Sequence, residues 1–192
     1  MRRAVSCLLL LLLPAACGPA KDQEVTRHVL VNAQTARDAV SQLTMRYGEI
    51  LDPARSRPGS PARAWEDVAG FRNSAEGLAA RQFLSEYSKP IPVDPAFARS
   101  REIEELSRVT AELVSLALEP RGTWESFVQE TNEIRSRLDR ALSALETGTK
   151  SFILVEARTK TEEKAVAYSR MLARAKAGAA DPAKKEGADK AP

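Results

Sequence analysis

Apolar residues recur at alternating intervals of three and four positions along most of the chain, which is the spacing of one face of an α-helix. The first such stripe, within residues 22–52, predicts an amphipathic helix that ends at Asp52 and Pro53. Its apolar members are Val29, Ala33, Ala36, Val40, Leu43, Tyr47 and Ile50. The proline- and glycine-containing residues 53–61 then form a predicted exposed loop.

A second helix is expected over residues 62–87, with apolar side chains available for burial along its length. Gly70 and Gly77 each weaken a helix by about 1 kcal/mol relative to alanine, so this element is expected to be broken or bent. Residues 89–95 contain three prolines and cannot continue a helix, which predicts an extended connector.

A third helix is expected over residues 95–118, with Asp94 as its N-cap and Pro95 at the first helical position. Proline lacks the amide hydrogen that the first helical turn leaves unpaired anyway. Pro120 and Gly122 close this element before the next helix begins.

The fourth helical pattern is the most regular in the chain and has Thr123 as its capping residue. Its seam consists of Phe127, Thr131, Ile134, Leu138, Ala141, Leu145, Gly148, Phe152 and Val155. Gly148 permits either a break or a kink. A continuous helix over 123–176 is favoured, because three residues leave little room for a reversal, and it would extend about 75 Å at 1.5 Å per residue.

These patterns predict an all-α fold, an antiparallel helical bundle of about four helices with a long C-terminal helix. The expected organisation is a removed signal peptide at 1–16, a lipidated tether at 17–22 and a helical domain at 23–176. Residues 177–192 contain no large apolar side chain and form a predicted disordered tail.

The amino terminus has the order of an export signal. Arg2 and Arg3 give a positive segment, residues 4–13 are apolar, and small residues follow. A membrane-spanning helix needs roughly 20 apolar residues, so this segment is too short to remain as one. It is therefore expected to be cleaved.

Cys17 directly follows Pro14, Ala15 and Ala16, and this arrangement resembles the lipobox of bacterial lipoproteins. The resemblance covers residues 1–17, and it departs from the family at Pro14, where leucine is usual. It implies that the Cys17 thiol receives a lipid and that the cleaved chain stays on a membrane.

Gly18 follows the cysteine, where family members retained at the inner membrane usually carry aspartate. In an organism with two membranes, the resemblance favours the outer membrane, with the domain facing the periplasm. The alternative is a plain secretory signal cut near Ala16, which would leave Cys17 as an ordinary thiol.

Cleavage changes both the charge and the thiol content. Without Arg2 and Arg3 the chain has 27 Lys and Arg against 26 Asp and Glu, a net charge of about +1. That balance disfavours a nucleic-acid partner. Cys7 lies in the removed segment and Cys17 carries the lipid, so no thiol remains for a disulfide, a metal or a nucleophile.

The sequence offers little for catalysis, and no enzymatic activity, metal site or cofactor is expected. His28 is the single histidine, and it stands four residues after Glu24 rather than in a Glu-x-x-His motif. Surface carboxylates on the helices are interpreted as a solvated face; they are Glu102, Glu104, Glu105, Glu130 and Glu133.

Two other features of the sequence are candidate contact sites. Trp65 and Trp124 each open a predicted helix, where an indole either packs on the core or anchors a partner, and packing is favoured. Arg55, Arg57 and Arg63 surround the first loop, where they either solubilise it or contact an acidic surface.

The functional hypothesis is a membrane-tethered envelope lipoprotein whose helical domain has a structural, assembly or adaptor role. Its protein partner or second copy is expected on the helix that contains Phe127, Ile134, Leu138, Leu145 and Phe152. The alternative is a sensor-like bundle that binds a small ligand, because Thr131, Ala141 and Gly148 leave room on the seam.

Overall fold

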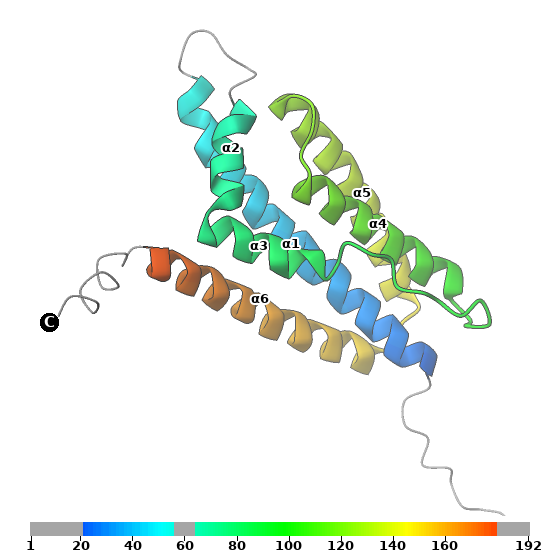
Figure 1. Cartoon of the computed structure of the whole chain (residues 1–192). Coiled ribbons are helices and arrows are strands. Elements are labelled where there is room, and N and C mark those ends of the chain that lie inside the picture. The colour runs from blue at the N-terminus through cyan, green and yellow to red at the C-terminus, as the bar shows by residue number, and fades with distance from the viewer. Residues whose placement is uncertain (1–20, 56–63, 180–192) are drawn as a thin grey trace, which may run out of the picture.

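In the computed structural model of the protein, the described residues are 21–55 and 64–179, and the described side chains exclude those of residues 52–67. All regular structure in these ranges is helical, which confirms the predicted all-α class. Figure 1 shows the helices packed against one another in a bundle. They are α1 (Lys21–Arg55), α2 (Ala64–Asn73), α3 (Ala75–Ser85), α4 (Ser100–Leu118), α5 (Trp124–Thr147) and α6 (Ser151–Ala179).

Helix α1 is the central element, because it packs against α4 and α6 and is also contacted by α2, α3 and α5 (Figure 1). Helices α2 and α3 return along α1, α4 runs parallel to it, α5 returns, and α6 runs parallel again. Contacts along α6 fix that direction, since Arg27 pairs with Glu156 and Gln34 accepts a hydrogen bond from Thr161. The chain therefore alternates in direction while α1 has parallel neighbours on two sides.

One continuous hydrophobic core runs along α1 and receives side chains from every other helix. Small residues on α1, among them Ala33 and Ala36, are fully buried and let neighbouring helices approach closely. The largest fully buried side chains are Tyr47, Phe127, Leu30, Leu51, Leu84, Ile103, Leu106, Leu113, Leu138 and Leu145. Each buried leucine contributes about 1.5–3 kcal/mol relative to exposure, so this core dominates the stability of the fold.

The predicted second helix is broken into α2 and α3 at Ser74. The Ser74 hydroxyl caps α3 by accepting a hydrogen bond from the Gly77 amide at 3.1 Å. A Cβ at position 77 would overlap the carbonyl oxygen of Phe71. Glycine at this position therefore lets the start of α3 pack directly against the end of α2. The sequence correctly indicated a break in this element, and Ser74 is where it falls.

The third helix begins later than expected, at Ser100 rather than near Pro95. Asp94 does act as a capping side chain, but it accepts from the Ala96 amide at 2.9 Å in a turn that precedes the helix. The N-cap position belongs to Arg99, whose side chain makes no capping bond. The guanidinium of Arg99 instead donates hydrogen bonds to the end of α5. The predicted start of the third helix near Pro95 was therefore wrong.

The prediction of a continuous helix over residues 123–176 was also wrong, because the chain turns at Gly148. Arg99 donates to the carbonyl oxygens of Leu145 and Ala144, each at 2.6 Å, and thereby satisfies the C-terminal end of α5. A Cβ on Gly148 would lie 2.6 Å from the same guanidinium. Three residues are enough for the turn, and α6 lies back across α1 and α3 instead of projecting as a rod.

The start of α5 agrees with the sequence. Thr123 and Ser126 form a capping box, in which each side chain accepts from the backbone amide of the other. Gly122 precedes it with a φ of +75°, a left-handed conformation that favours glycine. Glycine is also required at position 122 for steric reasons, because a Cβ there would lie 2.5 Å from the Ser126 hydroxyl oxygen.

Candidate functional site

Several residues singled out in the sequence lie outside the described part of the molecule. They are Cys17, which is the expected lipidation residue, the predicted signal peptide, most of the predicted tail at 180–192, and the loop arginines Arg57 and Arg63. Arg55 and Trp65 belong to helices α1 and α2, but their side chains are not among those described. The tether was expected to extend to residue 22, whereas α1 already begins at Lys21.

The predicted seam on the fourth helix divides at the turn. Phe127, Ile134, Leu138 and Leu145 are buried within α5, where they pack in the core of the same chain. Beyond the turn Phe152 is 49% exposed on α6. A partner that binds α5 therefore meets the opposite, outward face of the helix.

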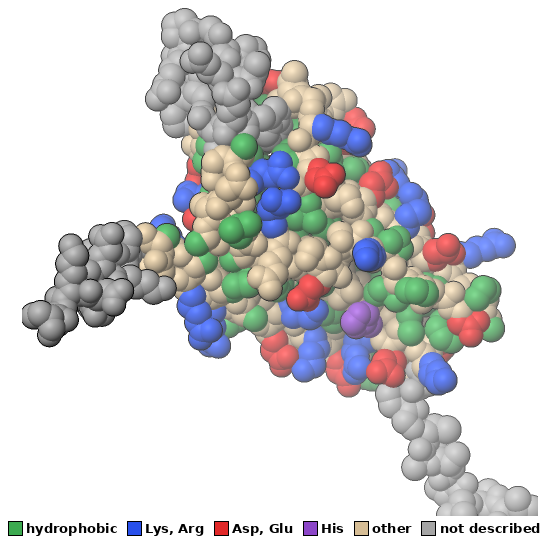
Figure 2. Space-filling model, in the orientation of Figure 1, with side chains coloured by type: hydrophobic (Ala, Val, Ile, Leu, Met, Phe, Trp, Pro, Cys, Tyr) green, Lys and Arg blue, Asp and Glu red, His purple; other side chains and the backbone are tan. Residues whose placement is uncertain are grey.

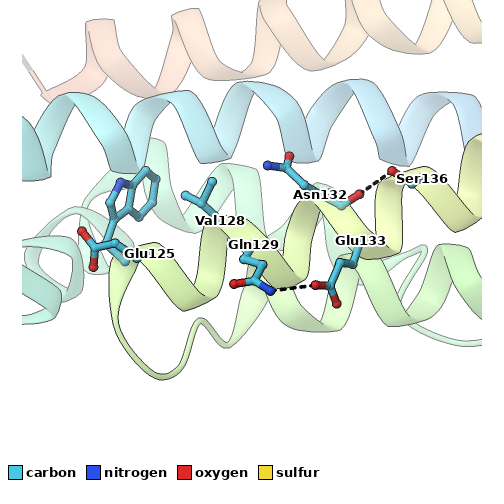
Figure 3. Close-up of a pocket in the computed structure, with 7 residues that line it drawn as sticks. Glu125, Val128, Gln129, Asn132, Glu133 and Ser136 are labelled. Atoms are coloured by element: carbon cyan, nitrogen blue, oxygen red, sulfur yellow. Dashed lines mark hydrogen bonds between the residues drawn. The ribbon is translucent and has the colours of Figure 1, made fainter.

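That outward face of α5 carries an open hollow of about 640 Å³. Figure 3 shows Val128 and Asn132 pointing toward α1, while Gln129 and Glu133 extend from the other side of the helix. Gln129 donates to Glu133 at 2.9 Å, which holds both side chains along the helix surface. The described residues that line the hollow are Trp124, Glu125, Val128, Gln129, Asn132, Glu133 and Ser136.

Trp124 combines the two interpretations that the sequence left open. The indole is partly buried and stacks on Phe127, with ring centroids 5.6 Å apart. Its other neighbour is Gly48 of α1, where a Cβ would be 3.5 Å from the indole edge. The same ring lines the α5 hollow, so it packs on the core and also presents an aromatic surface to a bound group.

A second hollow, which we term the α1/α3/α6 groove, has a volume of about 450 Å³ and is lined mostly by hydrophobic residues. Phe71 and Tyr168 supply aromatic surface, and Met45 at its edge is 64% exposed. Its lining residues are Gln42, Leu43, Met45, Arg46, Phe71, Glu76, Ala80, Tyr168 and Leu172. Ligand pockets commonly have volumes of about 300–1,000 Å³ and apolar walls with a few polar groups, and this groove fits that description.

Arg46 is the main polar group of the α1/α3/α6 groove. Its guanidinium pairs with Glu49 at 2.5 Å and with Glu76 at 3.5 Å, and it lies 5.9 Å from the centre of the Phe71 ring. The hydrogen bond from Arg46 to Glu49 raises the pKa of Arg46, with Glu76 adding to the shift. The Nε of Arg46 is buried without a hydrogen-bond partner, which leaves one donor for a bound group.

Tyr168 closes the floor of the α1/α3/α6 groove and is 2% exposed. Burial raises the pKa of Tyr168 to about 12, with smaller contributions from Tyr47 and Glu76. Phe83 of α3 stacks on the ring at a centroid distance of 4.5 Å. The phenol is therefore neutral and held rigidly at neutral pH.

His28 lies on the exposed side of α1. Its ring is 3.4 Å from the Asn32 amide nitrogen, and its pKa is lowered by partial burial and then by the nearby charges of Lys164 and Arg27. Glu24 acts in the opposite direction but more weakly. The imidazole is thus neutral at pH 7, and no group of three metal-ligating side chains gathers around it or elsewhere among the described residues.

No helix in residues 21–55 and 64–179 is both long enough and apolar enough to cross a bilayer. Comparison with known proteins found no matching family model, curated protein or solved structure.

Sequence reasoning missed the α1/α3/α6 groove entirely. Arg46 lies on the polar side of the first predicted stripe, and Tyr168 is separated from it by more than one hundred residues. No local pattern joins them, because the α6 reversal that brings them together is decided at Gly148. The α5 hollow was partly accessible, since Trp124 had been considered as an anchor.

Proposed function

We propose that this protein is a lipoprotein of the bacterial cell envelope, held on a membrane through Cys17, whose helical bundle binds another protein in a structural or adaptor role. The observation that carries the anchor is the order of Arg2 and Arg3, a short apolar segment, and Ala15 and Ala16 directly before Cys17. A cysteine at that position is the acceptor of a diacylglyceryl group in the lipoproteins that this segment resembles.

The proposed location is the periplasmic side of the outer membrane if the organism has two membranes. Gly18 supports this, because the residue after the cysteine directs sorting in such lipoproteins. Two or more acyl chains hold a protein stably, since each buried methylene contributes about 0.8 kcal/mol. The bundle then acts from a fixed position on the membrane.

The α5 hollow supports the role in protein binding. From Trp124 to Ser136 it follows α5 for about 18 Å, the length of three helical turns. It offers an indole and a valine as apolar contacts and amide and carboxylate groups around them, which is the composition of a partly polar protein interface. Glu125 and Glu133 are its charged lining residues, so the proposed partner is a protein segment with basic and apolar side chains.

The anchor is tested by mass spectrometry of the full chain recovered from membranes. The wild-type protein should have an acylated N-terminal cysteine, and Cys17→Ala should lose both the acyl group and the membrane association. Cys7→Ala is the matched control, because Cys7 lies in the removed signal and its loss should change neither readout. A soluble wild-type chain with a free Cys17 thiol would refute the anchor.

The protein contact is tested by placing a photo-crosslinking side chain at Gln129 in the membrane-bound protein. A discrete cross-linked product should form and should be lost when Glu133→Arg replaces one of the two carboxylates of the hollow with a positive charge. Glu163→Arg on α6 is the matched control, because Glu163 is also exposed and also accepts one hydrogen bond from a neighbour on its own helix, Lys160. Equal loss with both variants would contradict a role for the α5 hollow.

A second candidate function, binding of a small ligand, is favoured by the α1/α3/α6 groove. The charge of Arg46 is already balanced by Glu49 and Glu76, so the proposed ligand is neutral and mostly apolar. One hydrogen-bond acceptor on the ligand would satisfy the buried Nε of Arg46.

This candidate is tested with a neutral fluorescent naphthylamine that brightens in apolar surroundings. Binding to the full chain should weaken at least threefold in Arg46→Met. Arg108→Met is the control, because Arg108 also pairs with two glutamates on its own helix but lies away from the groove. If both variants bind the probe equally, the groove is not the ligand site.

A further inference from the structure

The chain leaves the bundle toward Cys17 at the end where α1 begins. We term this the anchor-side end and define it by the first turns of α1, α4 and α6 and the connector at residues 86–99. Lys21 is four residues after Cys17, and four extended residues span at most about 14 Å. A lipid on Cys17 therefore places the anchor-side end within about 14 Å of the membrane surface.

Contacts between helices show that the elements of the anchor-side end adjoin one another. Arg27, in the second turn of α1, pairs with Glu156 in the second turn of α6 at 2.8 Å. Arg99, at the end of the connector, also reaches Thr149 in the α5–α6 turn at 3.4 Å. The connector, the start of α6 and the start of α1 thus form one surface (Figure 1).

Apolar side chains are exposed on this surface from two separate segments. On α6, Phe152 is 49% exposed and Val155 is 65% exposed, although both are large hydrophobic residues. In the connector, Pro92 and Pro95 are exposed and Phe97 is half-buried. Figure 2 shows hydrophobic side chains gathered over the connector between α3 and α4. Exposed apolar groups from two segments at one end indicate a contact surface.

The position and the charge of this surface favour lipid as the group that covers it. The exposed charges there include Lys21, Lys89, Arg101 and Lys150 as well as Glu24, Glu86, Asp94 and Glu156, so neither sign dominates. A basic protein or an acidic polymer would gain little from such a surface. The core of a neutral headgroup layer accepts isolated phenylalanine and aliphatic side chains, and the tether brings that layer to this end.

We propose that the anchor-side end lies on the bilayer, with Phe152 and Val155 entering the headgroup region and fixing the orientation of the bundle. This inference rests on the proposed lipidation of Cys17. The lipid sets the distance to the membrane, and the apolar side chains set which surface faces it. The α5 hollow and the α1/α3/α6 groove then remain accessible from the periplasmic space.

The test compares Val155→Cys with Val166→Cys in the full-length lipidated protein. Both valines are exposed, at 65% and 48%. The spacing of eleven residues places them on the same face of α6, about 16 Å apart along the axis. With Cys7 removed and Cys17 acylated, the introduced thiol is the only one in the chain and can be labelled with a polarity-sensitive fluorophore.

Each labelled protein is reconstituted in phosphatidylcholine vesicles that contain a lipid-borne quencher. Quenching at position 155 should exceed that at position 166 at least twofold, and the emission at 155 alone should shift to the blue. Equal quenching in a sample with acylated Cys17 by mass spectrometry would overturn the orientation and leave the anchor intact. A sample in which Cys17 carries no lipid would overturn both proposals.

Discussion

Gly148 and Arg99 together decide where the C-terminal third of the chain goes. The guanidinium of Arg99 satisfies two carbonyl groups at the end of α5, and Gly148 leaves the space that it occupies. Arg99 is not notable in the sequence, because its contact with Gly148 joins positions 49 residues apart. Sequence periodicity identified Gly148 as the position where the helix either continues or breaks. It could not show that hydrogen bonds from Arg99, which lies outside this helix, stabilise the break.

We expect Arg99→Ala and Gly148→Ala each to lower the free energy of unfolding by about 1–3 kcal/mol, since both remove charge-assisted hydrogen bonds to α5. Arg101→Ala, at a fully exposed position two residues away, should change it by less than about 0.5 kcal/mol. Denaturant unfolding measures all three. The double variant should be clearly less destabilised than the sum of the single variants, because both act on one contact. Additive effects would contradict this interpretation.

Gly70 in α2 and Gly77 in α3 look alike in the sequence, but replacing them should have opposite effects on stability. A Cβ on Gly77 meets backbone atoms of Phe71 and Arg72, whereas a Cβ on Gly70 has no neighbour within 4 Å. Gly77→Ala should therefore destabilise the protein by about 2 kcal/mol or more. Gly70→Ala should stabilise it by about 0.5–1 kcal/mol through helix propensity. Thermal unfolding of the two variants checks the prediction, and a shift of the same sign in both would contradict it.

At the scale of elements, the periodic stripes predicted helices reliably but not their boundaries. The stripes correctly located α1 and α5, because burial of one helix face determines both the sequence pattern and the fold. The starts of α4 and α6 were missed because contacts from other helices set them. The α5 hollow was foreseen only through Trp124, and the α1/α3/α6 groove depends on a reversal that no local pattern records.

The packing of α6 on α3 should be sensitive to alkaline pH through Tyr168. Its pKa is raised from 10 to about 12 in the folded protein, so the neutral phenol contributes stability that is complete below pH 10. That contribution, about 2–3 kcal/mol, is lost as the pH rises from 10 to 12. Burial also raises the pKa of Tyr87 to about 12, with Glu86 adding to the shift, so Tyr87 is a second phenol that links ionisation to folding.

Between pH 10 and 12, we expect the free energy of unfolding of Tyr168→Phe to change less with pH than that of the wild type. Chemical denaturation at closely spaced pH values measures the difference, and ultraviolet titration of the phenols reports the ionisation directly. Tyr87→Phe serves as the comparison, and a change in the same direction is expected because the pKa of Tyr87 is raised to about the same value. Identical profiles for wild type and Tyr168→Phe would show that this phenol does not link ionisation to folding.

At the scale of the whole molecule, the folded-back α6 determines the overall dimensions. The longest described element is α1, whose 35 residues extend about 52 Å, whereas an uninterrupted α5 and α6 would reach about 75 Å or more. Small-angle scattering of the protein should therefore give the curve of a compact bundle. A cross-section and length typical of a rod would contradict the turn at Gly148.

The position of α1 at the centre also has a consequence for how the chain folds. Its partners on α6 lie 127 and 129 residues further along, so the hydrogen bond from Thr161 to Gln34 and the pair of Arg27 with Glu156 close very long loops. Most contacts of a helical bundle are local, so closing these two long loops is the entropically costly part of folding. The face of α1 that packs on α6 therefore stays exposed until the last helix is present, and the bundle is complete only when α6 has docked.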